Sequence, residues 1–168
     1  MEIIFFPGFP RLGLKYPEIA KFKNGKFILV GYSAGAIDAI DLARKNPELV
    51  ERLILIAPAG LAGVRNPLKH NYCFLKQLLY LDVRLVFRII VDIVRAFMID
   101  TRETKKIIKK IISFDLKEAL RKLPSKMEKE IVMYWDDKLF PGRKVEDGVT
   151  DVFGKIHILE GNHFSLFE

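Results

Sequence analysis

The sequence contains a single cysteine, Cys73, among its 168 residues. One cysteine cannot form a disulfide within the chain, and it cannot build a cysteine-based zinc site. We therefore interpret Cys73 as a small buried hydrophobic side chain. This interpretation fits a reducing compartment but does not require one.

Long hydrophobic runs are also missing. The most apolar stretch, residues 85–99, is interrupted by Arg88, Asp92 and Arg95. It is therefore shorter than the roughly 20 uninterrupted apolar residues that span a bilayer. The first residues lack the basic and long apolar regions of a secretory signal peptide. These absences predict a cytoplasmic protein without a membrane span.

Charge is distributed unevenly along the chain, which has a net charge of +7. Residues 62–126 contain 15 basic and 6 acidic residues, whereas the rest contains 13 basic and 15 acidic residues. No recognition motif accompanies this charge, so we expect no nucleic-acid partner. A basic face at Lys105, Lys106, Lys109 and Lys110 could touch anionic lipid, although such faces are more often simply solvated.

Short apolar runs predict the strands of a parallel sheet. Four of them are continuous rather than alternating, as in strands buried on both faces: residues 3–6, 27–30, 53–56 and 131–135. Residues 155–160 alternate between apolar and polar side chains, which is typical of an edge strand. We therefore expect an α/β fold with about five mostly parallel strands in sequential order.

Helical patterns separate these runs. Residues 34–45 place apolar side chains on one face, and Asn46-Pro47 ends the pattern. Residues 62–126 contain no strand-like run and instead carry amphipathic helical patterns. We therefore predict a core made of residues 1–61 and 127–168, with residues 62–126 inserted as an all-helical cap.

One motif in the first half of the chain carries chemistry. Gly31-Tyr32-Ser33-Ala34-Gly35 places a serine between two glycines, after a strand and before a helix. A very sharp strand-to-helix turn needs tiny neighbours two positions from the serine, and it aims the helix N-terminus at the reacting centre. In this context the motif predicts a nucleophile elbow.

With this motif the chain resembles the α/β-hydrolase family, of which it is an unusually short form. The likeness continues through residues 47–58, whose "P-E-x-V-x-x-L-x-L" pattern follows the elbow helix in that family. Residues 134–141 resemble the family's acid loop, and residues 161–164 resemble its histidine loop. The resemblance covers both flanks of the chain, and residues 62–126 correspond to the variable cap.

The resemblance implies a catalytic triad in the family's chain order of Ser33, Asp137 and His163. Asp136 is an alternative acid, but the spacing to Pro141 favours Asp137. His70 and His157 are weaker alternatives for the base, since one lies in the insertion and the other within a strand.

Residues 6–10 resemble the family's oxyanion loop. Pro7 and Pro10 have no N–H, so the backbone amides of Phe9 and Ala34 are the expected oxyanion donors. Pro7 stands where the family often has histidine.

Together these features predict a serine hydrolase that cleaves carboxyl esters with small to medium acyl chains, without metal or organic cofactor. A thioesterase, lipase, aminopeptidase or C–C hydrolase would use the same triad, and a non-catalytic ligand-binding protein is the alternative from another class. Sequential right-handed crossovers leave one face of the sheet bare. Either the cap or a second subunit must cover that face, and we predict a homodimer.

Overall fold

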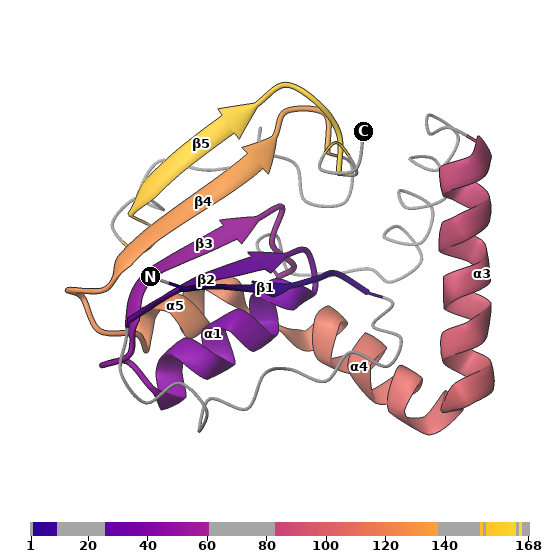
Figure 1. Ribbon diagram of the computed structural model, residues 1–168, viewed down its shortest axis with the longest axis horizontal. Coiled ribbons are helices and arrows are strands. Elements are labelled where there is room, and N and C mark those ends of the chain that lie inside the picture. The colour runs from indigo at the N-terminus through magenta and orange to yellow at the C-terminus, as the bar shows by residue number, and fades with distance from the viewer. Residues whose placement is uncertain are drawn as a thin grey trace.

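The computed structural model describes residues 2–9, 26–60, 83–137, 152, 154–163 and 165. Five strands form one parallel sheet in the order β1-β2-β3-β4-β5 (Figure 1). The strands are β1 (Glu2–Phe6), β2 (Phe27–Tyr32), β3 (Val50–Ile56), β4 (Glu128–Tyr134) and β5 (Lys155–Leu159). The predicted sheet and its sequential strand order are confirmed. Because all strands are parallel, their carboxyl ends lie along one rim.

The main hydrophobic core lies on one face of this sheet. Alternate side chains of each inner strand are buried there, for example Leu29 on β2, Leu53 on β3 and Ile131 on β4. Helix α1 (Gly35–Lys45) covers them with small and branched residues. The alanines of α1 bring its axis close to the strands, which fixes the position of the helix N-terminus at the carboxyl rim.

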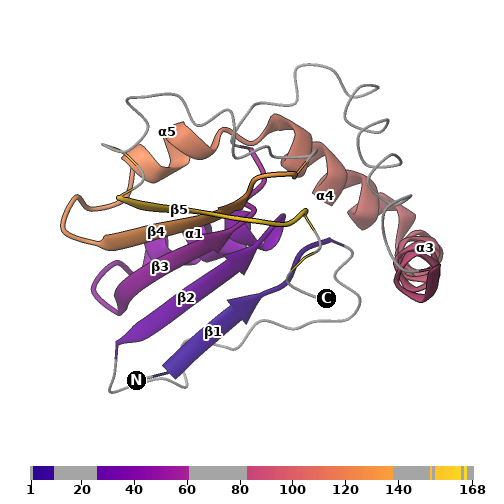
Figure 2. The same ribbon diagram turned by 90° about the horizontal axis from the view of Figure 1, so that it is seen from above.

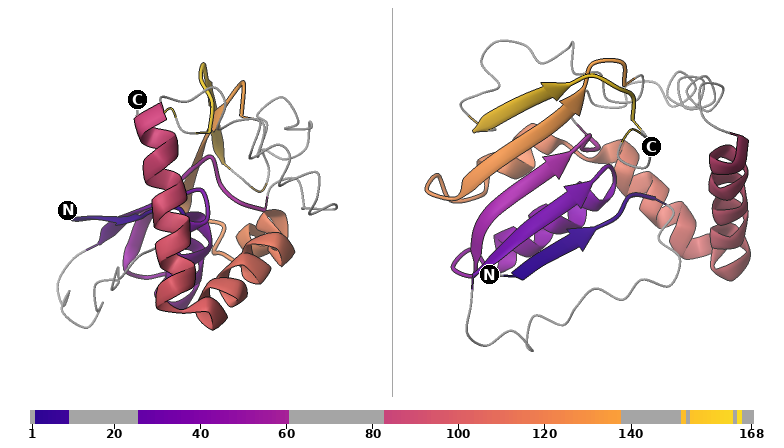
Figure 3. Two further views of the ribbon diagram at one scale, coloured as in Figure 1. Left: turned by 90° about the vertical axis from the view of Figure 1, so that its right-hand side faces the viewer. Right: turned by 45° about the horizontal axis from the view of Figure 1, so that its top comes forward.

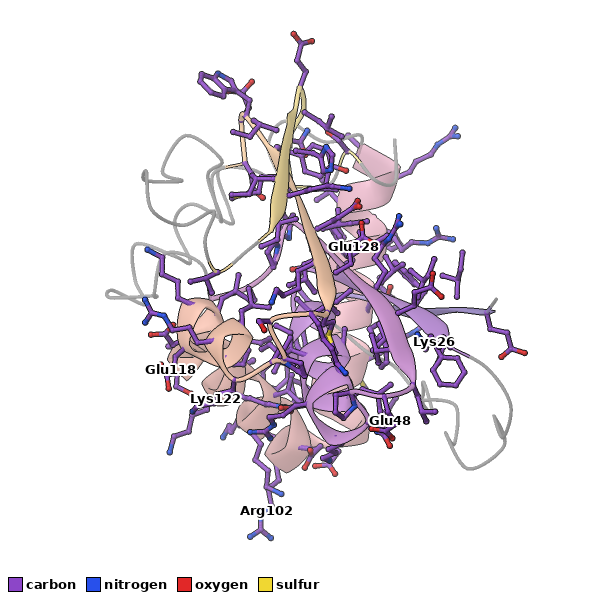
Figure 4. The ribbon with its side chains drawn as sticks, turned by 90° about the vertical axis from the view of Figure 1, so that its left-hand side faces the viewer. Lys26, Glu48, Arg102, Glu118, Lys122 and Glu128 are labelled. Atoms are coloured by element: carbon purple, nitrogen blue, oxygen red, sulfur yellow. The ribbon has the colours of Figure 1, made fainter. Side chains whose placement is uncertain are left out.

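Helix α5 (Leu116–Arg121) packs on the same face. Leu116 and Leu120 are fully buried in the core shared by α1 and the strands. The right-hand view of Figure 3 looks onto the other face, with α1 and α5 both behind the strands. The outer side of α5 is polar, with Lys122 paired to Glu118 at 3.1 Å (Figure 4).

Two longer helices precede α5 in the segment between β3 and β4. Helix α3 (Val83–Ile99) and helix α4 (Thr101–Ser113) meet at a corner where the Asp100 side chain caps α4 by accepting from the Glu103 amide. Thr104 is buried at this corner and donates to the Ala96 carbonyl. Figure 2 shows α3 standing away from the sheet, beyond the carboxyl ends of the strands.

Helix α3 exposes an apolar stripe. Phe87, Ile90 and Val94 are each about half exposed or more, and Val83 and Met98 are 80% exposed. Among the described helices, none combines the length and apolar character that crossing a bilayer requires.

Several positions named from the sequence lie outside the described residues. They include His70, Cys73 and Pro141.

The second face of the sheet is half apolar and half charged. On β1, Ile3 is 68% exposed and Phe5 is 46% exposed. Farther along, Arg52 and Lys155 both pair with Glu128, at 3.1 and 3.2 Å. These pairs hold the pKa of Glu128 below its usual value, with the hydrogen bond from Lys155 as the largest cause. The described helices α1 and α5 leave this face uncovered.

Candidate active site

Ser33 lies on the turn that joins β2 to α1. Its φ angle is +50°, a left-handed conformation that residues other than glycine adopt at a cost. Backbone bonds hold the turn, because the Ser33 amide donates to the Ile56 carbonyl and the Ser33 carbonyl accepts from Ala59. The side chain is only half buried, so the hydroxyl can be reached at the rim.

The two glycines of the motif sit where no side chain fits. A Cβ atom on Gly35 would lie 2.0 Å from the carbonyl oxygen of Phe6, and one on Gly31 would lie 2.7 Å from the Cα atom of Ala36. Gly35 thus lets the first turn of α1 pass against the end of β1. Gly31 does the same for β2 and α1.

The structure brings Ser33, His163 and Asp137 together. His163 Nε2 lies 3.0 Å from Ser33 Oγ, and His163 Nδ1 lies 2.8 Å from Asp137 Oδ2. His163 and Asp137 are 3% and 1% exposed, respectively. An ionised carboxylate only accepts hydrogen bonds, so Nδ1–H donates to Asp137 and the neutral Nε2 is left to accept the Ser33 proton.

The acid loop and the histidine loop are tied together by their backbones. The Trp135 amide donates to the Leu159 carbonyl at 2.8 Å, and the Asp136 amide donates to the Gly161 carbonyl at 2.9 Å. Asp136 is exposed, whereas Asp137, one residue later, turns its carboxylate to the imidazole. Of the two acids that the sequence left open, the geometry places Asp137 in contact with His163.

The segment after β1 lies directly against the elbow. A Cβ atom on Gly8 would be 3.2 Å from Ser33 Cβ and 3.1 Å from the Tyr32 ring. Phe9 follows Gly8, and Ala34 is the N-cap residue immediately before α1. The two predicted oxyanion donors therefore belong to segments that meet beside the Ser33 side chain.

Tyr32 is a residue that the sequence analysis did not single out. Its hydroxyl donates to the main-chain carbonyl of His163 at 2.5 Å, and its ring lies 5.5 Å from the imidazole. No local pattern announces such a contact, because 131 residues separate the two positions. Only its place next to Ser33 in the motif could have drawn attention to it.

His157, the weaker candidate for the base, does not join this group. It lies on β5, is about half exposed and faces Glu130 at 3.6 Å. Within the part of the chain that the structure describes, no group of three or more His, Cys, Asp or Glu side chains could hold a metal ion.

Comparison with solved structures identifies the architecture. A thermophilic esterase superposes with a TM-score of 0.61 at 21% identity, covering 88% of this chain and 62% of its own. The chain has the α/β-hydrolase fold. An N-formylmaleamic acid deformylase from Pseudomonas putida is similar, with a TM-score of 0.57, 15% identity and coverage of 86% and 63%.

A meta-cleavage product hydrolase from Pseudomonas fluorescens is also similar, with a TM-score of 0.53 and 16% identity, and the match covers 98% of this chain and 72% of that one. The chain spans about three fifths of the length of the thermophilic esterase and of the deformylase. No protein-family model matches the sequence, and no curated protein matches it.

Proposed function

We propose that the protein is a serine hydrolase that cleaves carboxyl esters through an acyl-enzyme on Ser33. One observation carries the proposal: Ser33 Oγ, the imidazole of His163 and the carboxylate of Asp137 form a continuous hydrogen-bonded chain, with links of 3.0 and 2.8 Å. A serine hydroxyl is a weak nucleophile until a base takes its proton, and this chain supplies the base and its orienting acid.

In the first half-reaction, Ser33 Oγ attacks the ester carbonyl carbon while His163 Nε2 takes the hydroxyl proton. The imidazolium that forms is stabilised by the buried carboxylate of Asp137, which also fixes the ring tautomer. The carbonyl oxygen becomes an oxyanion, for which we propose the Phe9 and Ala34 amides as donors. Collapse of the intermediate expels the alcohol, which receives its proton from His163.

In the second half-reaction, His163 acts again as a base and takes a proton from water. The resulting hydroxide attacks the acyl-enzyme, and the carboxylate product leaves as Ser33 regains its proton. This sequence needs only protons and water, so the groups on the chain suffice for it. The nearly complete burial of His163 and Asp137 keeps their hydrogen bond away from bulk water.

Structural neighbours support a hydrolase but span several bond types. They include an esterase, a deformylase and a meta-cleavage product hydrolase. We favour ester hydrolysis because it requires the fewest groups beyond the triad. C–C hydrolysis is the second candidate, favoured by the neighbour whose match covers 98% of this chain.

A fluorophosphonate probe tests the nucleophile. We expect covalent labelling of the wild type and loss of labelling in Ser33→Ala. Ser113→Ala is the matched control, since Ser113 is an exposed serine on α4 whose hydroxyl donates to the backbone carbonyls of Lys109 and Lys110. Absence of labelling in folded wild-type protein would reject the proposed function.

A panel of p-nitrophenyl esters with increasing acyl length then tests the substrate class. We expect turnover of short and medium esters that is lost in Ser33→Ala. If labelled protein hydrolyses none of these esters but cleaves the C–C bond of a meta-cleavage product, C–C hydrolysis is the correct alternative.

A further inference from the structure

Tyr32 makes an interaction that the proposed reaction does not itself use. It is 3% exposed and donates its hydroxyl proton to the His163 main-chain carbonyl at 2.5 Å. Burial, with a smaller contribution from the Asp137 charge, raises the pKa of this hydroxyl well above its ordinary value. The hydroxyl therefore stays protonated and remains a donor over the whole working range of pH.

The Tyr32 ring is also confined. It lies 5.5 Å from the imidazole of His163, tilted by 35°, and its edge is so close to Gly8 that a Cβ there would be 3.1 Å away. The side chain therefore fills the space between the segment after β1 and the loop after β5. Its hydroxyl has little freedom to choose another acceptor.

The sheet topology explains why this contact matters. Ser33 follows β2 and His163 follows β5, and two strands lie between them. At about 4.8 Å for each strand spacing, these strand ends are roughly 14 Å apart. The histidine loop must therefore lean back across β3 and β4 to bring Nε2 within 3.0 Å of Ser33.

Asp137 holds the imidazole from one side, but it comes from the end of β4 rather than from the elbow. Tyr32 comes from the elbow and is the residue immediately before the nucleophile. Its bond to the His163 carbonyl ties the backbone of the base to the turn that carries the nucleophile. A shift of the turn at Ser33 therefore also moves the loop that carries His163, and the reverse holds.

We propose that Tyr32 is a positioning residue, whose hydroxyl fixes the main chain of His163 so that the imidazole stays within hydrogen-bonding distance of Ser33. This inference rests on the proposed function of the triad. Tyr32 does not touch the reacting atoms through its hydroxyl, so its effect passes through His163.

Tyr32→Phe removes the hydroxyl and keeps the ring. Because misplacing a catalytic group by about 1 Å costs up to about 100-fold in rate, we expect kcat to fall about 10- to 100-fold. KM for a short p-nitrophenyl ester should change little, since the lost interaction does not bind substrate. Fluorophosphonate labelling should slow by a similar factor.

Tyr134→Phe is the matched control. Tyr134 is buried in the same small cluster as Tyr32, yet no described hydrogen bond joins its hydroxyl to His163. We expect this variant to keep the wild-type kcat. An equal loss of kcat in both variants would overturn the proposal. It would show that the loss does not come from the hydrogen bond between Tyr32 and His163.

A spectroscopic measurement separates positioning from stability. In Ser33→Ala protein, the Nδ1 proton between His163 and Asp137 should give a far-downfield proton resonance, which should broaden or disappear on adding Tyr32→Phe. An unchanged resonance together with unchanged kcat overturns the proposal. Replacing Tyr32 with 4-aminophenylalanine returns a donor to the same place and should restore most of the rate, even if Tyr32→Phe does not fold.

The catalytic role of Ser33 and the positioning role of Tyr32 can be tested separately. If the wild type is neither labelled nor active, the proposed function fails. If the wild type is labelled and Tyr32→Phe is labelled equally fast, only the role of Tyr32 fails. A second check is His163→Ala, in which adding Tyr32→Phe should have no further effect on residual activity.

Discussion

The ammonium group of Lys110 on α4 lies 2.8 Å from a carboxylate oxygen of Asp41 and 3.6 Å from one of Asp38, both on α1. This cluster joins the segment between β3 and β4 to the helix that begins at the elbow. All three side chains are partly exposed, so solvent screens the attraction.

Lys110→Gln should therefore change global stability little, by less than about 1 kcal/mol. Its effect should be local, with faster amide hydrogen exchange along α4 and the melting temperature nearly unchanged. Lys109→Gln, next to it but without a described carboxylate partner, is the control. A loss of several kcal/mol in Lys110→Gln would mean that the cluster supports the whole fold.

Asp137→Asn should lower kcat by about 10⁴-fold while the protein still folds, because the amide favours the wrong imidazole tautomer. Ester turnover at saturating substrate measures the effect. Asp136→Asn is the matched comparison, since Asp136 is the neighbouring acid, is exposed and is not the carboxylate that contacts His163. Comparable losses in both variants would contradict the assignment of Asp137 as the orienting acid.

Gly35→Ala should destabilise the fold. The added Cβ would stand 2.0 Å from the Phe6 carbonyl oxygen, and a backbone atom cannot be moved aside by a rotamer change. The end of β1 or the start of α1 must shift, at a cost of about 1–3 kcal/mol or more. Urea unfolding gives the value, and Lys45→Ala at the exposed end of α1 serves as the control.

Stability should fall at alkaline pH because Tyr32 is buried. The pKa of its hydroxyl is raised in the folded state, mainly by burial, whereas in the unfolded chain it is near 10. The unfolded state therefore loses this proton first. The contribution of the protonated Tyr32 hydroxyl to the free energy of unfolding is complete below about pH 10. It is lost as the pH rises above that value, at about 1.4 kcal/mol for each pH unit.

Thermal unfolding from pH 8 to 11.5 measures this slope, and Tyr32→Phe should make it shallower. An identical pH dependence in the two proteins would show that Tyr32 already ionises freely in the folded state.

We also propose that the open face of the sheet binds a second copy of the chain. Ile3 and Phe5 expose apolar surface there, and the neighbouring charges are balanced, because Arg52 and Lys155 pair with Glu128 and Glu130. Two copies of this face would therefore not repel each other electrostatically. Light scattering at micromolar concentration should show a dimer.

Phe5→Lys should yield monomers. Met98→Lys, on the exposed stripe of α3, is the comparison because it lies on a different element. Dissociation by Met98→Lys alone would place the interface on α3 instead, and a wild-type monomer would remove the proposal altogether.

Much of the architecture could be predicted because its signals are local. Continuous apolar runs predicted the strands, and the motif around Ser33 carries its own geometric requirement, since two positions must lack a side chain. The pairing of Ser33 with residues 104 and 130 positions away came from chain order in a known family, not from periodicity.

Other features were beyond the sequence because they depend on packing between distant segments. Residues 116–123 were grouped with the predicted cap, yet Leu116, Leu120 and Leu123 pack in the main core with the strands. The amphipathic pattern is the same in either setting, so it cannot tell which surface the helix covers. The bond from Tyr32 to His163 likewise has no signature in either segment.

The long connection between β3 and β4 has a consequence for how the chain can vary. It runs over residues 57–127, yet β3 and β4 pair side by side in perfect register from Arg52 with Glu128 to Ile56 with Val132. The entropy lost in closing a flexible loop rises only with the logarithm of its length, by about 0.6 kcal/mol for each doubling. Helices α3 and α4 could therefore be shortened, lengthened or exchanged while the strands keep their partners.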